Sequence, residues 1–278
     1  MIAISDKLSI DQAPFGEAFG RRPLSVSHDL IDDPLLALEA VARLAERLPA
    51  ASIEHNKGDL PKIVDPNAVE QSDLPVGEIA RTIDTNGCWM VIKNIEQDAA
   101  YRALLEELLA GVAPLVADRD GGMTFLQGFV FLSAPGSTTP SHTDPEHNFL
   151  LQVRGQKDMN VGEFPDPSTR QLELEQTFGG GGHRNIEWEP SNPRTFDLQP
   201  GDGVYVPPHA PHWVKNGPTA SVSLSITFQT PANKREINVH AFNARLRKIG
   251  LSPSPPDRRP ALDRQKANAQ RVLSRLAR

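Results

Sequence analysis

Short apolar runs alternate with Gly- and Pro-containing turns between about residue 122 and residue 230. The runs are MTFLQGFVFLS, NFLLQVR, KDMNVGEF, RTFDLQ, GVYVP and SVSLSITFQT. Many short strands at this spacing are typical of a β-sandwich or barrel. Gly155-Gln156 separates two of the runs, and we expect a hairpin there. In the last run, apolar residues alternate with Ser223, Ser225, Thr227 and Gln229, so one face of this strand is polar. That face either meets solvent or lines an internal pocket.

Helical patterns lie on both sides of the β region. Asp33 as an N-cap, followed by Pro34, predicts a helix with one apolar stripe that ends at Pro49. CWMVIKNI (88–95) predicts a strand, and AYRALLEELLAGVAPL (100–115) predicts an amphipathic helix that ends near Gly111 and Pro114. Two basic amphipathic helices follow Thr230, joined by the Pro-rich LSPSPPDRRP. We therefore predict a mainly β fold with flanking helices.

The predicted elements divide the chain into three parts. Residues 1–85 form a helical or irregular part that packs on the core, residues 86–232 form the β core, and residues 233–278 form a helical tail. No run approaches the roughly 18 apolar residues of a membrane span, and the N-terminus lacks the pattern of a secretory signal. The one cysteine, Cys88, excludes an internal disulfide framework and a cysteine-based zinc site. We expect a cytoplasmic protein.

The charge is distributed unevenly along the chain. From Lys234 to Arg278, twelve Lys and Arg stand against three Asp and Glu, which gives the tail about +9 and leaves about −15 of the total of −6 for the rest. A basic tail can bind nucleic acid, or it can dock on an acidic body or a partner subunit. Because no nucleic-acid motif with interleaved aromatic residues is present, we favour docking.

The stretch TPSHTDPEHNFLLQVRGQK (139–157) contains the first half of a candidate metal site. At the end of a strand, His142 and Asp144 point the same way, because residues i and i+2 share a face. The third ligand is expected from QPGDGVYVPPHAPHWVKNG (199–217), which carries His209 and His212. Two histidines and one carboxylate with open positions suit Fe(II) oxygenases, although catalytic zinc can use the same set.

Lys157 favours an iron site that binds a dicarboxylate. A lysine inside a barrel is costly unless it meets an anion, and a dicarboxylate that chelates the metal with its other end would supply that anion. Thr139 could donate its hydroxyl to the same carboxylate. Asn148 lies on the strand face opposite Phe149 and could point inward.

These motifs together resemble those of the JmjC, or cupin-like, Fe(II)/2-oxoglutarate oxygenases over roughly residues 122–230. The similarity is greatest to the asparaginyl hydroxylase that inhibits hypoxia-inducible factor, where Thr-Pro-x-His-x-Asp is followed by Asn-Phe and Gly-x-Lys at the same spacing. The resemblance implies a double-stranded β-helix, or jelly roll, core. It implies that His142, Asp144 and His212 bind Fe(II), with His212 preferred to His209 because it completes Pro-x₄-His from Pro207.

The resemblance also assigns the cosubstrate pocket. Lys157 would pair with the distal carboxylate of 2-oxoglutarate, helped by Thr139 and Asn148, and Thr227 stands where the hydroxylase has a late-strand asparagine. Gln229 replaces a neighbouring tryptophan, and the tyrosine that helps to bind 2-oxoglutarate has no clear counterpart. These departures affect the outer pocket and the substrate rather than the iron site.

The implied activity is hydroxylation with Fe(II), 2-oxoglutarate and O₂, giving succinate and CO₂. The substrate is a peptide or protein side chain, or alternatively a small molecule. Two further readings stay open: a cupin-type metal enzyme without 2-oxoglutarate, in which Lys157 has no role, and a non-catalytic regulator that binds DNA through its tail. C-terminal helices make a dimer in the related hydroxylase, which favours a homodimer. The roles of His183, Arg184 and His209 stay open, with a lid at His183-Arg184 as one reading.

Overall fold

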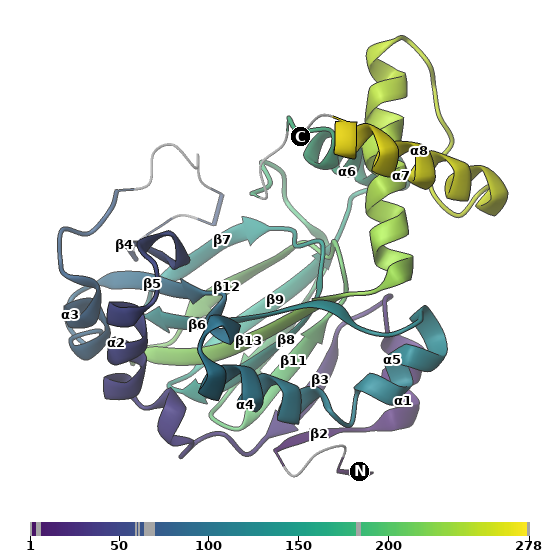
Figure 1. Ribbon diagram of the computed structural model, residues 1–278. Helices are drawn as coiled ribbons and strands as arrows, with labels where there is room; N and C mark the ends of the chain where they lie inside the picture. The colour runs from purple at the N-terminus through teal and green to yellow at the C-terminus, as the bar shows by residue number, and fades with distance from the viewer. Residues whose placement is uncertain are drawn as a thin grey trace.

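Two antiparallel sheets form the centre of the protein (Figure 1). The computed structural model describes residues 2–3, 7–58, 60, 62–63, 70–181 and 185–276. In spatial order, the larger sheet contains β1 (Ile2–Ala3), β2 (Leu8–Ile10), β3 (Leu24–His28), β11 (Asp202–Val206), β8 (His147–Arg154), β13 (Ser221–Gln229), β6 (Thr124–Ser133), β5 (Cys88–Lys93) and β4 (Ile53–Lys57). The smaller sheet contains β10 (Ser191–Leu198), β9 (Lys157–Glu163), β12 (His212–Asn216) and β7 (Thr138–His142).

Eight of these strands form the double-stranded β-helix. β6, β13, β8 and β11 belong to the larger sheet, and β7, β12, β9 and β10 make up the smaller one. The two sheets enclose the apolar cluster that includes Leu150, Met159 and Val214. The predicted jelly-roll core is therefore confirmed, and each of the six apolar runs of residues 122–230 contributes one strand.

Helices cover the outer face of the larger sheet (Figure 1). The helices on this face are α1 (Gln12–Ala18), α2 (Leu38–Arg47), α3 (Val76–Arg81), α4 (Ala99–Leu109) and α5 (Ala113–Asp120), with 3₁₀ turns at Pro34–Leu36, Ala50–Ser52 and Ile95–Gln97. Period two in the strands sends Met90, Ile92 and Val130 to this face, where they join Leu105 of α4 in the main hydrophobic core. Three further helices, α6 (Pro167–Phe178), α7 (Pro231–Lys248) and α8 (Pro260–Leu276), lie at one end of the molecule.

The first 85 residues contain strands that the sequence patterns did not predict. Leu8–Ile10, Leu24–His28 and Ile53–Lys57 are strands that widen the larger sheet at both of its edges. Each has five residues or fewer and is stabilised by pairing with a partner distant in sequence, as β3 is by β11. The expectation of a helical or irregular segment was therefore wrong for these residues, because short strands give little periodicity.

Two predicted helices are each split. The Asp33 carboxylate accepts a hydrogen bond from the Leu35 N–H at 3.0 Å, as expected of an N-cap, but the chain makes a 3₁₀ turn before α2 begins at Leu38. The helix predicted over residues 100–115 ends as α4 at Leu109, and Pro114 lies in the first turn of a new helix, α5. Proline is favoured in a first turn because its missing N–H has no partner there.

Gly155-Gln156 joins strands of different sheets. The sequence predicts a hairpin here, but β8 pairs with β11 and β13, whereas β9 pairs with β10 and β12. Gly155 has φ +67°, and a Cβ at this position would lie 2.3 Å from the Ala220 carbonyl oxygen, so only glycine fits the corner. The hairpin expectation was wrong, and the corner carries the chain from one wall of the barrel to the other.

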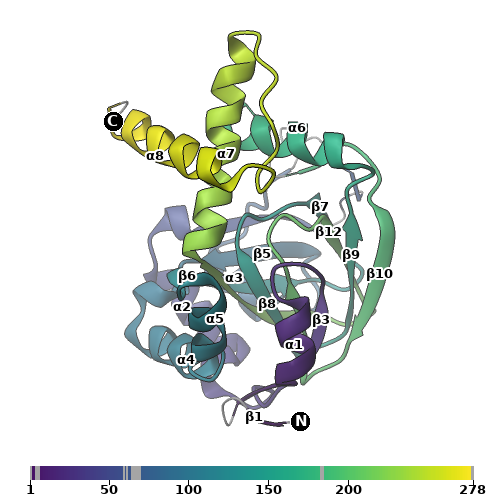
Figure 2. The same cartoon turned by 90° about the vertical axis from the view of Figure 1, so that its right-hand side faces the viewer.

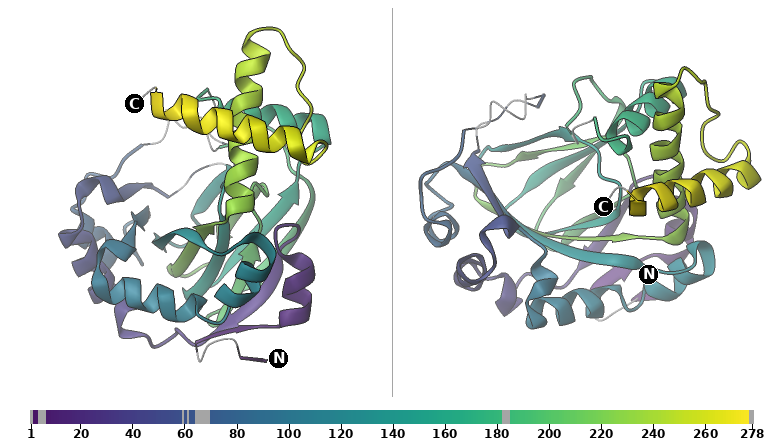
Figure 3. Two further views of the ribbon diagram at one scale, coloured as in Figure 1. Left: turned by 45° about the vertical axis from the view of Figure 1, so that its right-hand side comes forward. Right: turned by 45° about the horizontal axis from the view of Figure 1, so that its top comes forward.

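The C-terminal helices stand apart from the β core. Figures 2 and 3 show α8 crossing α7 at one end of the molecule, close to α6. Asp263, Lys266, Ala267 and Gln270 form the buried face of α8. In the described part of the chain, no helix has the length and apolar composition that crossing a membrane requires.

Candidate metal centre and cosubstrate pocket

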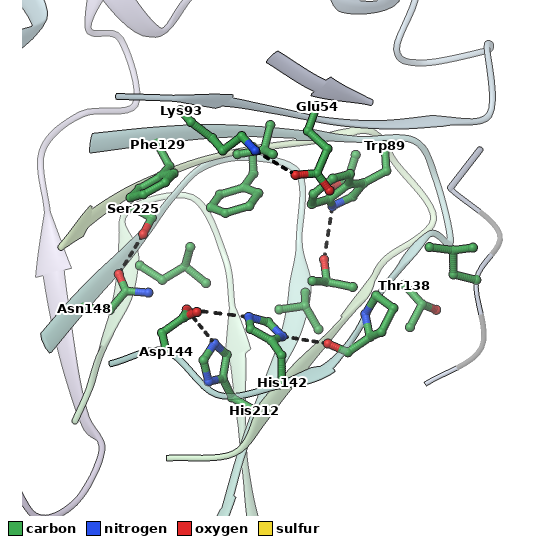
Figure 4. A pocket seen from close by; sticks show the side chains of 18 of the residues that line it. Glu54, Trp89, Lys93, Phe129, Thr138, His142, Asp144, Asn148, His212 and Ser225 are labelled. Atoms are coloured by element: carbon green, nitrogen blue, oxygen red, sulfur yellow. Dashed lines mark hydrogen bonds and ion pairs between the residues drawn. The ribbon is translucent and has the colours of Figure 1, made fainter. Parts of the chain in front are cut away.

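Three predicted ligands meet at one end of the barrel (Figure 4). β7 and β12 are neighbouring antiparallel strands, and His142 lies directly opposite His212 in their register. Asp144 follows two residues after β7 ends. Its Oδ2 lies 3.6 Å from Nε2 of His142 and 3.5 Å from Nε2 of His212. The pairing of two strands thus brings together side chains 70 positions apart in the sequence.

Backbone carbonyls fix the orientation of both imidazole rings. Nδ1–H of His142 donates to the Pro140 carbonyl at 2.7 Å, and Nδ1–H of His212 donates to the Ala210 carbonyl at 2.8 Å. Because a carbonyl only accepts, Nδ1 carries a proton in each ring, and Nε2, the nitrogen nearest Asp144, is the one available to a metal ion. This is how metal-binding histidines are commonly held.

The donor set fits a divalent metal ion. One ligand atom from each of the three residues lies within 4.8 Å of the others. The N–O separations of 3.5 and 3.6 Å are long for hydrogen bonds, but they suit two donors that share one ion at bonds of about 2.1 Å. Two imidazoles and one carboxylate on one side of an ion leave the remaining coordination positions open.

All seven predicted site residues line one cavity of about 470 Å³ between the sheets. Besides the three candidate metal ligands, these are Thr139, Asn148, Lys157 and Thr227. Their strands are neighbours in space but not in the sequence. The structure therefore brings the candidate metal ligands and the candidate cosubstrate residues into one site.

Lys157 lines the same cavity at a distance from the metal triad. It begins β9, four residues before Val161, which is opposite His212 in the register with β12. Four residues of strand span about 13 Å. The Lys157 residue is 4% exposed, and burial lowers its pKa to about 7. Among the residues the structure describes, no carboxylate contributes to that pKa. The buried amine of Lys157 is therefore a candidate partner for a bound anion.

The polar face of β13 turns inward. Ser223, Ser225 and Thr227 are all buried, and the last two line the cavity. The Ser225 hydroxyl donates to Asn148 Oδ1 at 2.8 Å, and Thr227 is opposite Asn148 in the register with β8. Thr227 Oγ1 is buried and has no hydrogen-bond partner in the described structure. The polar face of this strand, which the sequence left open as solvent-exposed or pocket-lining, therefore lines the pocket.

An aromatic wall completes the cavity and was missed by the sequence analysis. Trp89 of β5 and Phe129 and Phe131 of β6 project into it, and the Lys93–Glu54 ion pair of 2.9 Å lies at its rim (Figure 4). Period two in both strands could have indicated this face: Trp89, Val91 and Lys93 alternate with core residues, as Phe129 and Phe131 do. The sequence alone gave no reason to place β5 beside the metal ligands.

His147 and His209, the two histidines closest in sequence to the candidate ligands, lie outside the triad. His147 is stacked between Phe19 and Phe228 at ring distances of 4.5 and 4.9 Å, and burial lowers its pKa to about 3. His209 faces Glu236 of α7, 3.9 Å away, and burial lowers its pKa to about 4. Both are therefore neutral structural residues. His183 and Arg184, considered above as a lid, lie outside the described residues.

Comparison with known proteins agrees with this architecture. Residues 120–236 match the family model described as the JmjC domain. The structure of the ribosomal oxygenase YcfD from Escherichia coli, in complex with cobalt and 2-oxoglutarate, is similar with a TM-score of 0.55 at 18% identity, over 96% of this chain and 67% of that one. A complex of YcfD with cobalt and succinic acid gives a TM-score of 0.53 at 17% identity, over the same shares of the two chains. A search of curated proteins gave no significant match.

Fold and site together define a double-stranded β-helix protein with a two-histidine, one-carboxylate centre. Residues 120–236 match the JmjC domain, and the jelly-roll fold and the arrangement of the three candidate metal ligands agree with that match.

Proposed function

We propose that this protein is a 2-oxoglutarate-dependent dioxygenase that hydroxylates a side chain of a peptide or protein. The observation that carries the proposal is one cavity with a metal triad at one end and a buried, unpaired lysine at the other. A metal alone would not require Lys157. A dicarboxylate that reaches from the metal to the ammonium accounts for both features.

Each group has a distinct task in this proposal. His142, Asp144 and His212 hold Fe(II), and Lys157 with Thr139 binds the distal carboxylate of 2-oxoglutarate. Asn148 and Thr227 provide the polar wall beside it. When bound, iron, 2-oxoglutarate and O₂ supply the oxidant through oxidative decarboxylation to succinate and CO₂. The aromatic residues Trp89, Phe129 and Phe131 exclude water from the remaining side of the cavity.

The rim of the cavity supports a macromolecular substrate over a fully enclosed metabolite. The larger sheet continues past the jelly-roll strands through β5 and β4, and Glu54 and Lys93 lie on this extension. Their side chains are 54% and 33% exposed, so groups of a bound peptide can reach them. YcfD, which shares the fold, is a ribosomal oxygenase, and this supports a protein substrate for the present chain. A cytoplasmic location stays a prediction.

Anaerobic spectroscopy tests the proposed function directly. Addition of Fe(II) and then 2-oxoglutarate to the purified protein should give the weak visible charge-transfer band of the chelate. No band in the wild type would refute the proposal. If the band forms, peptides and small molecules can be screened for stimulated succinate release, and stimulation by small molecules alone would replace the peptide substrate with a metabolite.

The pH dependence of cosubstrate binding should report on Lys157. Its pKa is about 7 without an anion, and a paired carboxylate raises the pKa of an ammonium. Above pH 7, binding of 2-oxoglutarate must therefore take up a proton, and its Kd should rise by up to about tenfold per pH unit. Calorimetry in two buffers of different ionisation enthalpy should show about one proton taken up at pH 8.5 and almost none at pH 5.5. Binding without proton uptake at pH 8.5 would contradict the role of Lys157.

We also propose a homodimer formed through the C-terminal helices. Leu262, Val272, Leu273 and Leu276 of α8 are 36–79% exposed, although the helix already buries another face. Light scattering should give twice the chain mass of 30.4 kDa for the wild type. Leu273→Asp with Leu276→Asp should give a monomer, because charges cannot be buried unpaired. Gln265→Asp, on an exposed polar position of the same helix, should stay dimeric. A monomeric wild type would refute the dimer.

A further inference from the structure

One side-chain hydrogen bond crosses between the two sheets inside the cavity. Trp89 of β5, in the larger sheet, donates its indole N–H to Oγ1 of Thr139 of β7, in the smaller sheet, at 3.1 Å. Figure 4 shows Trp89 on the wall opposite the metal triad with its nitrogen turned into the cavity. Trp89 packs on Phe131 at a ring distance of 5.9 Å, which limits its rotation. The bond therefore joins a rigid aromatic residue to a predicted cosubstrate residue.

The bond determines how the Thr139 hydroxyl can act. An indole nitrogen only donates, so Thr139 Oγ1 must be the acceptor and its own O–H must point elsewhere. Among the described residues, this hydroxyl makes no other hydrogen bond. The neighbouring Thr138 differs, because its Oγ1 accepts from Lys215 Nζ at 3.2 Å. Thr139 is thus left with one free donor inside the cavity.

The strand register places this donor between the candidate metal centre and Lys157. Thr139 is opposite Val214, and Val214 is opposite Met159. Met159 lies two residues from Lys157 along β9, and Val214 lies two residues from His212 along β12. Two residues of strand span about 7 Å. A dicarboxylate that extends from the metal to Lys157 must pass the Thr139 hydroxyl.

We propose that Trp89 is a positioning residue for 2-oxoglutarate, which holds the Thr139 hydroxyl as a donor to the distal carboxylate. This inference rests on the proposed function. Without the indole N–H, the Thr139 hydroxyl is free to rotate and must be ordered when the cosubstrate binds. A hydrogen bond to a charged carboxylate is stronger than one to a neutral group, so its correct orientation affects affinity.

A double-mutant cycle tests the coupling of the two residues. 2-Oxoglutarate is titrated calorimetrically into protein loaded with Co(II), using wild type, Trp89→Phe, Thr139→Val and the double variant. Trp89→Phe keeps an aromatic ring and should raise the Kd about 5- to 10-fold, with a similar rise for Thr139→Val. The double variant should bind no more weakly than Thr139→Val alone, because the tryptophan acts through the threonine. The Kd for Co(II) should not change.

Trp188→Phe is the matched control. Trp188 stacks on Phe164 at 5.0 Å, lies outside the cavity lining and has an indole nitrogen without a hydrogen-bond partner in the described structure. Its substitution should leave the Kd of 2-oxoglutarate within about twofold of wild type. An unchanged Kd in Trp89→Phe, or additive losses in the double variant, would overturn the positioning role. If the wild type itself fails to bind 2-oxoglutarate, the proposed function fails instead.

Discussion

Lys157→Met is expected to weaken 2-oxoglutarate binding by at least about 100-fold and, at the same time, to stabilise the protein. The variant loses the cation that pairs with the distal carboxylate. It also removes a buried ammonium that has no carboxylate partner in the described structure, and methionine fills nearly the same space. We expect the free energy of unfolding to rise by about 2 kcal/mol and Tm by roughly 5 °C.

The stability gain should depend on pH in a defined direction. In the unfolded chain the pKa of Lys157 is near 10.5, and burial lowers it to about 7 in the folded protein. Burial of the charge therefore costs most below pH 7, and this cost disappears as pH rises toward 10.5. The gain in Tm from Lys157→Met should be larger at pH 6 than at pH 9. Scanning calorimetry at both pH values measures it.

Lys93→Met provides the control for this experiment. Lys93 lies at the rim of the same cavity, but it has Glu54 as an ion-pair partner at 2.9 Å. Its replacement should not raise Tm and should leave 2-oxoglutarate affinity nearly unchanged. A Lys157→Met variant that is less stable than wild type and still binds 2-oxoglutarate would show that the lysine has a structural task only.

Asp144→Asn should abolish high-affinity metal binding and reduce turnover by at least about 1000-fold. The amide keeps the shape of the side chain but removes the anionic ligand 3.5–3.6 Å from the two histidine nitrogens. In the wild type, Co(II) at 100 times its Kd should stabilise the folded state by about 2.7 kcal/mol, because the ion binds the folded protein alone. The variant should show no such increase in Tm.

Glu146→Gln is the matched substitution for the metal experiment. Glu146 lines the same cavity two residues further along the chain, where its Oε1 accepts a hydrogen bond from Gln229 at 3.0 Å. The structure places it outside the metal triad, so Co(II) should still raise Tm as in wild type. Equal loss of metal binding in both variants would indicate that the carboxylates act through the general charge of the cavity rather than through coordination.

Local sequence patterns predicted most strands of the β core and two of the three candidate metal ligands. Alternation in Ser221–Gln229 identified a strand with a polar face, and the i, i+2 spacing placed His142 and Asp144 on one side of the chain. Such inferences hold because side chains alternate between the two faces of a strand, and this alternation does not depend on which strand pairs with it. The direction in which the polar face of β13 turns did not follow from alternation, because solvent and a polar pocket both accept hydroxyl groups.

Relations between distant strands were decided only by the tertiary structure. The choice of His212 as the third member of the triad came from a family resemblance, and its position opposite His142 depends on the pairing of β7 with β12. The corner at Gly155 moves β9 into the other sheet, and pairing with β11 makes a strand of Leu24–His28. Trp89 meets Thr139 because β5 extends the opposite sheet. Register and sheet order depend on packing between segments far apart in sequence, whereas sequence periodicity reports only on neighbours along the chain.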